Sequence, residues 1–398
     1  MYDLIEKPRK RYGRLRKCEF HLHTPASHDY QFTKDKLFSE LSIEEVIEVS
    51  AEMGCLNKEV KDSLLANIEK YQGNKYVNDL KQKGVPYSGL KEYIAYKTIA
   101  YKLYKEEVEV VVVSDHNNLA VFKKVAYALE EYYVEQIKGV EKDKRGCIYT
   151  FLGVEISCSD KNHVVIIYDN NRIDELEDYL GEIILTEEYG TFLDSRSIIE
   201  SISQRGGIAY LAHLNSSEWL GSGAYKQKLY SMEELKLIGI KDFRQKDSVI
   251  HQLRSYIDNP EEQFSFINEG DAHNIQDIGI NNTWVKFNKI DFQSLNKAID
   301  NRNISIYAQK PKKSNKFIKG IVSIPGEHGF LNNKDNRISF ANKIEDIFSV
   351  YFSRDLNCII GGRGTGKSTL LQTMEIIYSR ETDDKRMLEF ISQNKIIY

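Results

Sequence analysis

The chain has 398 residues, of which 41% are hydrophobic and 29% are charged, and its formal net charge is -4. This length predicts two domains, or one large and one partial domain. The near balance of charge argues against a protein that coats nucleic acid by bulk charge, although a local basic patch is compatible with it. The five cysteines include no CxxC pair, which argues against a disulfide framework and a thiolate zinc site. No apolar run is long enough to span a bilayer, and residues 1–17 lack the apolar core of a signal peptide, so we expect a cytoplasmic protein.

The predicted elements alternate between strands and helices along most of the chain. Residues 1–17 are basic and irregular, residues 18–24 resemble a short strand, and apolar residues recur at helical spacing through residues 36–108. A β-branched run at residues 108–113 predicts a buried parallel strand, and residues 118–137 follow as a helix. Further strands are predicted at 148–157, 163–169, 206–215, 264–274 and 283–287, with a helix near 194–205. This alternation predicts an α/β barrel or a doubly wound sheet.

The composition changes at residues 307–316, a Pro/Lys/Asn-rich stretch that is the best candidate for a linker. Beyond it, apolar stretches at 317–324, 337–341 and 356–360 predict strands of a second domain. We therefore expect a basic segment at 1–17, a first domain at 18–306 with a helical insertion at 31–108, and a second domain at 317–398.

Side chains of the kinds that bind metal ions gather at the ends of the predicted strands. They are His21, His23, His28, Asp29, Asp115, His116, Glu155, His163, His213, Asp271 and His273. One strand-end histidine is usually a surface residue, but the ordered set is hard to obtain by chance, and in an α/β barrel the strand ends converge on one face. Imidazoles and carboxylates without thiolates suit zinc, manganese or iron.

The spacing within these motifs has a physical reason. On a strand, residues i and i+2 point the same way, so His21 and His23 would face one metal while Phe20 and Leu22 pack on the other side. The same alternation would bring Asp271 and His273 together.

In order, HLHTPAS, SDHNN, GVEIS, HVVII, AYLAHLN and GDAHN resemble the motifs of the polymerase and histidinol phosphatase (PHP) superfamily, over roughly residues 18–290. The resemblance implies a distorted (β/α)7 barrel that holds up to three metal ions. It implies one metal on His21, His23, Glu155 and Asp271, a second shared through Glu155 with His163 and His213, and a third on Asp29, His116 and His273. Asp115 would orient a neighbouring imidazole. The catalytic group would be His21, His23, Asp115, Glu155 and Asp271.

One position departs from the common family pattern. Many members have Asp directly after Ser, whereas here Ser27 is followed by His28 and then Asp29. The spacing in some members favours Asp29 as the third-metal ligand, and His28 remains the alternative.

Clustered divalent cations lower the pKa of a bound water and neutralise the charge of a phosphate. The implied reaction is therefore hydrolysis of a phosphoester.

A nucleotide motif lies near the end of the chain. GGRGTGKS at residues 361–368 fits the pattern GxxxxGK[ST], with an expected apolar strand before it and a helical pattern after it. Backbone amides would surround the phosphates, Lys367 would reach the β- and γ-phosphates, and Ser368 would coordinate magnesium. The nucleotide-binding set is Gly361, Gly364, Gly366, Lys367, Ser368 and Thr369. No apolar strand ending in Asp follows, so we expect only the N-terminal part of an ATPase lobe.

The combination resembles PHP domains fused to SMC/ABC-type ATPases of the TrlF-like group, through RLRKCEFHLHTPASHDY and CIIGGRGTGKSTLL. The resemblance implies a nuclease regulated by a fused ATPase, acting on DNA or RNA in tRNA processing or anti-phage defence, with ATP and magnesium bound in a longer protein and a homo-oligomer formed through the ATPase lobe. The alternatives are a phosphatase of a small phosphomonoester and a non-catalytic metal-binding scaffold.

Overall fold

The structure is a computed structural model, and it describes residues 2–9, 12–140, 145–215, 223–312, 317–325, 330, 333–340, 343–379 and 382–398. The chain divides into two compact units. The barrel unit is Arg14–Pro311, and the P-loop unit combines Met1–Gly13 with Lys312–Tyr398. No helix among the described residues is long and apolar enough to cross a membrane.

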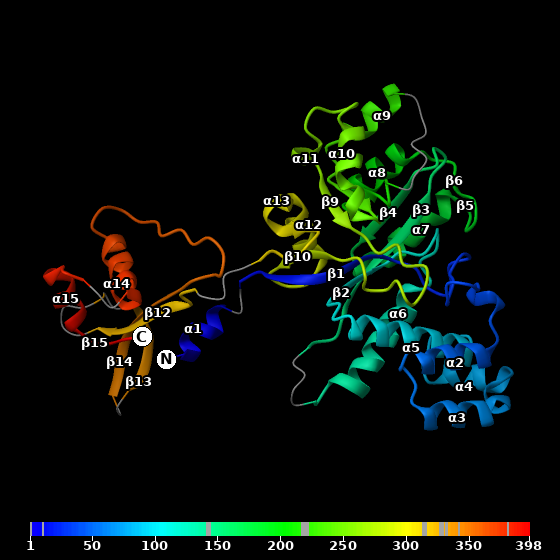
Figure 1. The fold of residues 1–398 in the computed structure, drawn as a ribbon, viewed down its shortest axis with the longest axis horizontal. Helices are drawn as coiled ribbons and strands as arrows, with labels where there is room; N and C mark the ends of the chain where they lie inside the picture. Colours follow the sequence, from blue (N-terminus) through cyan, green and yellow to red (C-terminus); the bar gives the residue numbers. More distant parts are fainter. Residues whose placement is uncertain are drawn as a thin grey trace. The chain divides into compact units, whose positions relative to one another are not determined.

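A mixed sheet forms the centre of the barrel unit (Figure 1), and among the described residues it has nine strands. In sheet order they are β11 (Ile306–Tyr307), β10 (Thr283–Phe287), β1 (Arg14–Leu22), β2 (Val110–Val113), β3 (Tyr149–Ser157), β4 (His163–Tyr168), β7 (Ile208–Leu211), β8 (Leu237–Ile240) and β9 (Ser265–Asn268). Strand β4 runs antiparallel to both neighbours, β3 and β7, whereas β1, β2 and β3 are parallel. These positions confirm the strands predicted between residues 108 and 287.

The sheet curls until it nearly closes. After β9, the backbone of residues 270–272 reaches β1, where Gly270 N–H donates to the Phe20 carbonyl at 2.8 Å and His23 N–H donates to the Ala272 carbonyl at 3.3 Å. The unit is therefore a nearly closed barrel with a mixed sheet, and the doubly wound alternative is wrong.

Along the strands, side chains point alternately into the barrel and outward toward the helices. Phe20, Val112, Phe151 and Tyr210 belong to one interior cluster. Residues that alternate with them pack outward against helices, as Val113 does. The interior is thus a packed core and not a pore.

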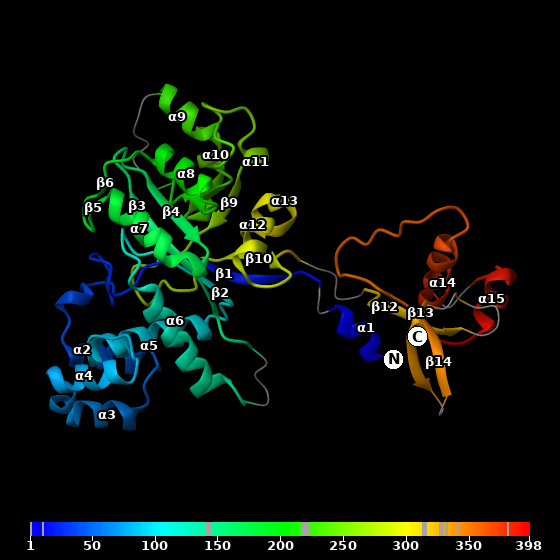
Figure 2. The ribbon, with the colours of Figure 1, turned by 180° about the vertical axis from the view of Figure 1, so that it is seen from behind.

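Helices cover the outer faces of the sheet (Figures 1 and 2). Residues 31–108 supply α2 (Ile43–Glu52), α3 (Lys58–Ala66), α4 (Asn74–Gln82) and α5 (Leu90–Lys105), which confirms the helical pattern predicted for residues 36–108. The others are α6 (Phe122–Tyr132), α7 (Ile173–Ile183), α8 (Ser195–Gln204), α9 (Gly223–Tyr230), α10 (Lys246–Leu253), α11 (Pro260–Gln263), α12 (Phe292–Asp300) and α13 (Arg302–Ser305). A two-stranded hairpin, β5 (Ile184–Thr186) and β6 (Gly190–Thr191), lies between α7 and α8 in the chain.

The P-loop unit has an antiparallel sheet whose order is β13 (Asn333–Phe340), β14 (Lys343–Tyr351), β12 (Gly320–Pro325) and β15 (Asn394–Ile397). Helices α1 (Tyr2–Arg9), α14 (Lys367–Ser379) and α15 (Lys385–Ser392) complete it. Strands β12 and β13 confirm two of the predicted strands in this region. Of the expected linker, residues 313–316 lie outside the described residues, and Tyr307 pairs within the sheet of the barrel unit.

Two sequence expectations are wrong here. Residues 1–17 are not an irregular segment: they contain α1, whose buried Ile5 lies against Gly320 of β12, and the start of β1. Residues 356–360 form no strand, and Leu356 and Ile360 are 89% and 91% exposed. A strand needs a hydrogen-bonding neighbour, and none of the described strands pairs with this stretch.

Candidate metal centre

The barrel brings nine potential metal donors to one edge of its sheet. His21 lies in β1, Glu155 lies in β3, and other donors follow the carboxyl ends of β1, β2, β7 and β9. His163 begins its strand instead of ending it, and it reaches the same edge because β4 runs antiparallel. The nine are His21, His23, Asp29, His116, Glu155, His163, His213, Asp271 and His273.

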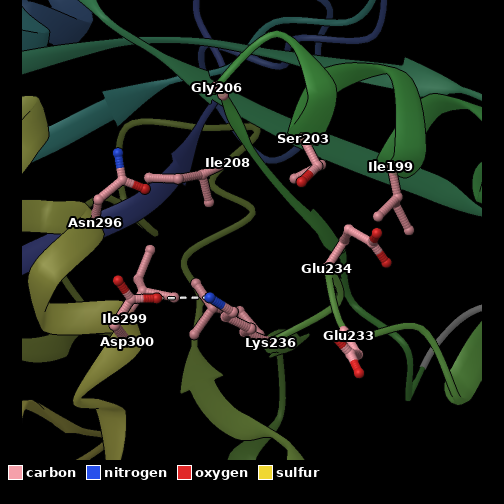
Figure 3. A pocket seen from close by; sticks show the side chains of 13 residues that line it. Ile199, Ser203, Gly206, Ile208, Glu233, Glu234, Lys236, Asn296, Ile299 and Asp300 are labelled. Carbon is pink, nitrogen blue, oxygen red and sulfur yellow. Dashed lines mark hydrogen bonds and ion pairs between the residues drawn. The ribbon is translucent and has the colours of Figure 1, made fainter.

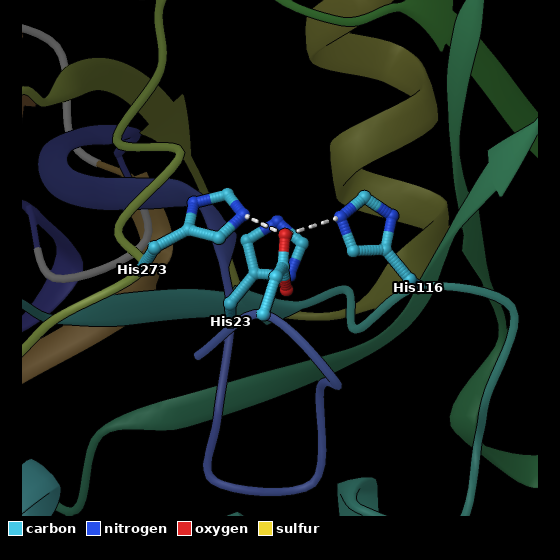
Figure 4. A group of neighbouring side chains, drawn as sticks. His23, His116 and His273 are labelled. Atoms are coloured by element: carbon cyan, nitrogen blue, oxygen red, sulfur yellow. Dashed lines mark ion pairs between the residues drawn. The ribbon is translucent and has the colours of Figure 1, made fainter. Parts of the chain in front are cut away.

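Three overlapping groups among the described residues have ligand atoms within 4.8 Å of one another. They are His21, His23 and Asp271; His116, Glu155 and His163; and His23, Asp29, His116 and His273. In the last group, the imidazoles surround a carboxylate (Figure 4), and Asp29 Oδ2 lies 3.3 Å from His116 Nε2 and 3.1 Å from His273 Nε2. His28 belongs to none of the three groups.

Glu155 lies between the groups and is fully buried. Its Oε1 lies 2.7 Å from His163 Nδ1 and 3.0 Å from His213 Nε2. Its Oε2 lies 2.9 Å from His21 Nε2, and 3.2 Å from both His23 Nε2 and His116 Nδ1. One carboxylate is therefore within reach of five imidazoles.

The unsatisfied atoms of this cluster fit a metal ion. Glu155 Oε2, Asp271 Oδ1, His23 Nδ1 and His116 Nδ1 are buried and make no hydrogen bond. Burying a charged or polar atom without a partner costs several kcal/mol, on the order of 2–7. Lone pairs of nitrogen and oxygen that converge in this way are the donor set of zinc, manganese or iron.

Three of the donors have strained backbones. His21, His213 and Asp271 have φ values of 72°, 29° and 43°, in the left-handed region that non-glycine residues rarely adopt. Such conformations cost on the order of 1–3 kcal/mol each, and they persist where the surrounding structure enforces them.

A bulge in β1 corrects the expected alternation. The pairing of β1 with β2 shifts between Glu19 and Leu22, so that three residues of β1 span two of β2. As a result Phe20 packs in the interior cluster and Leu22 in the outer one. The prediction that Phe20 and Leu22 share a face is therefore wrong, although the two histidines meet, with their Nε2 atoms 2.9 Å apart.

Asp115 also differs from its expected role. It accepts hydrogen bonds from the Thr24 backbone N–H and hydroxyl, both at 2.6 Å, whereas its nearest approach to His23 Nδ1 is 3.8 Å. Asp115 thus makes no hydrogen bond to the His23 ring and holds the residue that follows His23. Burial raises the pKa of Asp115 to about 7, despite those hydrogen bonds.

Two residues that contact the metal donors were not predicted from the sequence. The buried Glu269 places Oε2 3.2 Å from His21 Nδ1, and its Oε1 accepts from the His213 backbone N–H. Lys241 Nζ lies 2.7 Å from Asp271 Oδ2. Glu269 precedes Asp271 by two residues, and this i, i+2 spacing could have identified it as a neighbour of the donors. Nothing in the sequence distinguished Lys241 from other lysines.

The imidazoles of the cluster differ in charge. Burial, together with the charge of His273, lowers the pKa of His23 to about 4. Burial also lowers the pKa of His273, but the carboxylates of Asp271 and Asp29 outweigh it and raise that pKa to about 10. Burial raises the pKa of Glu155, and the charges of His21 and His116 outweigh it and hold that pKa well below its usual value.

Metal binding should therefore release protons. At pH 7 His273 is protonated in the metal-free protein, and a ligating nitrogen must be unprotonated. We expect about one proton to be released from this residue per metal bound beside it, and the apparent manganese affinity to fall as the pH falls. Calorimetric titration in two buffers of different ionisation enthalpy measures this, and identical heats in both would contradict it. His251→Ala, at an exposed histidine of α10, should behave as the wild type.

The P-loop residues belong to the other unit. Gly364 and Gly366 have φ values of 79° and 82°, and α14 begins at Lys367. Lys367 Nζ donates to the carbonyls of Gly361 and Gly362 at 2.7 and 2.6 Å. The loop borders a cavity of about 460 Å³ that Phe330, Phe348 and Thr369 also line. Ser368 follows Lys367 in the first turn of α14.

A separate hollow of about 520 Å³ lies at the amino ends of β7 and β8 (Figure 3). It is lined by Ile208, Lys236 and Asp300 among others, and by none of the nine donors. Because the donors gather at the opposite ends of these strands, the hollow is not part of the candidate metal centre.

No protein-family model matches the chain. Among solved structures, it is similar to the lesion-specific endonuclease PfuEndoQ from Pyrococcus furiosus, with 11% identity, a TM-score of 0.39, and coverage of 72% of this chain and 56% of that one. It is also similar to an Endonuclease Q bound to a duplex with an abasic lesion, with 14% identity, a TM-score of 0.36 and coverage of 51% of both chains. A protein of Bifidobacterium adolescentis described as a "putative metal-dependent phosphoesterase" has 12% identity, a TM-score of 0.29, and coverage of 45% of this chain and 82% of that one. The matched region thus spans about half the length of the two endonuclease chains.

One protein shares a higher sequence identity with this chain than these solved structures do. An uncharacterized protein of Streptococcus pneumoniae serotype 4 is 30% identical over 245 residues, which cover 59% of this chain and 87% of that protein. The chain therefore belongs to the same family as this streptococcal protein.

Proposed function

We propose that the barrel unit is a PHP-type, distorted (β/α)7 barrel that hydrolyses phosphoesters with bound divalent metals, and that its substrates are phosphodiesters of nucleic acid. The observation that carries the proposal is the convergence of imidazole and carboxylate donors around the buried Glu155.

The donors divide among up to three metal positions. His21, His23 and Asp271 would hold one metal, with Glu155 as a shared ligand. Glu155 would also serve a second metal with His163 and His213, whose ring nitrogens lie 2.7 and 3.0 Å from Oε1. Asp29, His116 and His273 would hold the third. When bound, the metals would lower the pKa of a water molecule and neutralise phosphate charge.

Neighbouring residues would orient these ligands. Glu269 beside His21 Nδ1 favours the tautomer with a proton on that nitrogen, which leaves Nε2 free to bind a metal. Asp115 fixes Thr24 by two hydrogen bonds and so positions the backbone after His23. The pre-set side chains would hold the metals, and through them a phosphate group, without rearranging, and such preorganisation is usually the largest source of catalytic power.

The test is hydrolysis by manganese- or zinc-loaded protein of four substrates: a phosphomonoester, a simple phosphodiester, DNA and RNA. We expect cleavage of the diester and of at least one nucleic acid, abolished in the double variant His21→Ala/His23→Ala and unchanged in His251→Ala. Cleavage of the monoester alone would contradict the proposal in favour of a small-molecule phosphatase. Bound metal without any hydrolysis would favour a scaffold.

We also propose that residues 361–368 bind the phosphates of a nucleotide, as in the SMC/ABC-type ATPases of TrlF-like proteins, and that the P-loop unit regulates the nuclease. The left-handed glycines and the helix start at Lys367 support phosphate binding. For this, the Lys367 ammonium would have to leave the two carbonyls to which it donates.

This chain by itself should not hydrolyse ATP. The described lining of the cavity beside the loop contains no carboxylate, and hydrolysis needs one to hold magnesium and to position water. We expect phosphate release from ATP at the background rate, with an unchanged metal content in Lys367→Ala. ATP hydrolysis that is lost in Lys367→Ala would contradict this expectation.

A further inference from the structure

Lys241 lies directly after β8, at the edge of the sheet where the metal donors gather. Its Nζ is 2.7 Å from Asp271 Oδ2, and its side chain is 45% exposed whereas that of Asp271 is 8% exposed. Lys241 therefore connects the buried cluster with its solvent-accessible side.

Asp271 uses its two oxygens differently. Oδ1 faces the imidazoles, 3.2 Å from His273 Nδ1 and 3.5 Å from His23 Nε2. Oδ2 binds Lys241. A metal held by Oδ1 would therefore leave the contact between Asp271 Oδ2 and Lys241 in place.

Loops on both sides hold the backbone of Lys241. Its N–H donates to Asn215 Oδ1 at 3.0 Å, and its carbonyl accepts from Asn281 Nδ2 at 2.8 Å. Among the residues that the structure describes, no other lysine or arginine has a recorded ion pair with one of the nine donors. The backbone of Lys241 is thus held from both sides, and its ammonium reaches Asp271 from there.

We propose that Lys241 contacts the phosphate group of the substrate, as the cationic anchor of the metal centre. An ammonium has three N–H donors, and Asp271 accepts from one of them. The other two N–H groups can donate to non-bridging phosphate oxygens. This inference rests on the proposed function, because it assigns Lys241 to the same site.

The chain offers a matched control at the other end of the same strand. Lys236 lies directly before β8, pairs with Asp300 at 2.6 Å and is 37% exposed (Figure 3). It resembles Lys241 in pairing and exposure, but it lies away from the metal donors. Lys236→Met therefore removes an equivalent charge without touching the cluster.

The experiment measures binding of inorganic phosphate to manganese-loaded protein by calorimetry, with metal content determined by elemental analysis and folding by circular dichroism. We expect Lys241→Met to weaken phosphate binding about tenfold with unchanged metal content, Lys241→Arg to retain most of the affinity, and Lys236→Met to match the wild type. Wild-type phosphate affinity in Lys241→Met would overturn the inference. So would loss of metal in Lys241→Met with metal and phosphate affinity kept in Lys241→Arg, since Lys241 would then only hold Asp271.

The two proposals can fail separately. A wild-type protein that binds phosphate through Lys241 but hydrolyses no phosphodiester contradicts the proposed function and keeps this inference. An active wild-type protein whose Lys241→Met variant binds phosphate normally contradicts this inference alone. In an active protein, Lys241→Met should also lower kcat/KM for the diester, by about 100-fold, because contacts to developing charge contribute that much.

Discussion

Glu155→Gln should remove two metal equivalents per chain at once. Both oxygens of Glu155 are used: Oε1 lies beside His163 and His213, and Oε2 beside His21, His23 and His116. The amide keeps the size of the side chain but loses the negative charge that would balance two metal cations. Elemental analysis after dialysis should therefore show a loss of two metals, and phosphodiester hydrolysis should fall to the background rate.

Glu269→Gln is the matched control for this prediction. Glu269 is also buried and lies beside His21, but it belongs to none of the three donor groups. Its replacement should weaken metal binding about 10- to 100-fold through the orientation of His21, and only at one position. Retention of all bound metal in Glu155→Gln would contradict the bridging role.

The double variant His21→Ala/Asp271→Ala should be hardly less active than either single variant. His21 Nε2 and Asp271 Oδ1 lie 3.8 Å apart in one donor group, so either loss dismantles the same metal position. Residues that act as a unit give non-additive losses. We expect each single variant to lose about 10³-fold or more in kcat/KM for a phosphodiester, and the double variant to differ from them by less than about tenfold.

Steady-state kinetics of the wild type, the two single variants and the double variant measure these losses. His251→Ala is the histidine control. Multiplying losses would indicate independent roles for His21 and Asp271. Single variants that keep most of the wild-type activity would place the catalytic site elsewhere.

The kinds of donor and their order along the chain could be predicted from the sequence. Strands are recognisable by their β-branched runs, as at Val110–Val113, and polar residues that follow such runs stand out by type and spacing. The nine donors were all among the candidates found in this way, the resemblance to the PHP superfamily singled them out, and the structure brings all nine to one edge of the sheet. The helical insertion was equally readable, since apolar residues at helical spacing need no distant partner to be recognised.

Local patterns could not predict what depends on pairing between distant segments. Strict alternation would have placed His21 and His23 on the face of Glu19, away from the interior, and the bulge between Glu19 and Leu22 turns them inward. Likewise, only the antiparallel course of β4 brings His163 to the edge where the other strands end. Residues 356–360 have the composition of a strand but no neighbour to pair with.

The sequence by itself therefore determined which kinds of side chain the site contains, because side-chain type and strand-forming pattern are local properties. The tertiary structure decided which atoms meet. The contacts of Glu269 with His21 and of Lys241 with Asp271 join segments 248 and 30 residues apart, and no local pattern encodes them. They arise because the sheet curls until the residues after β9 pair with β1, which places the ends of β1, β8 and β9 side by side.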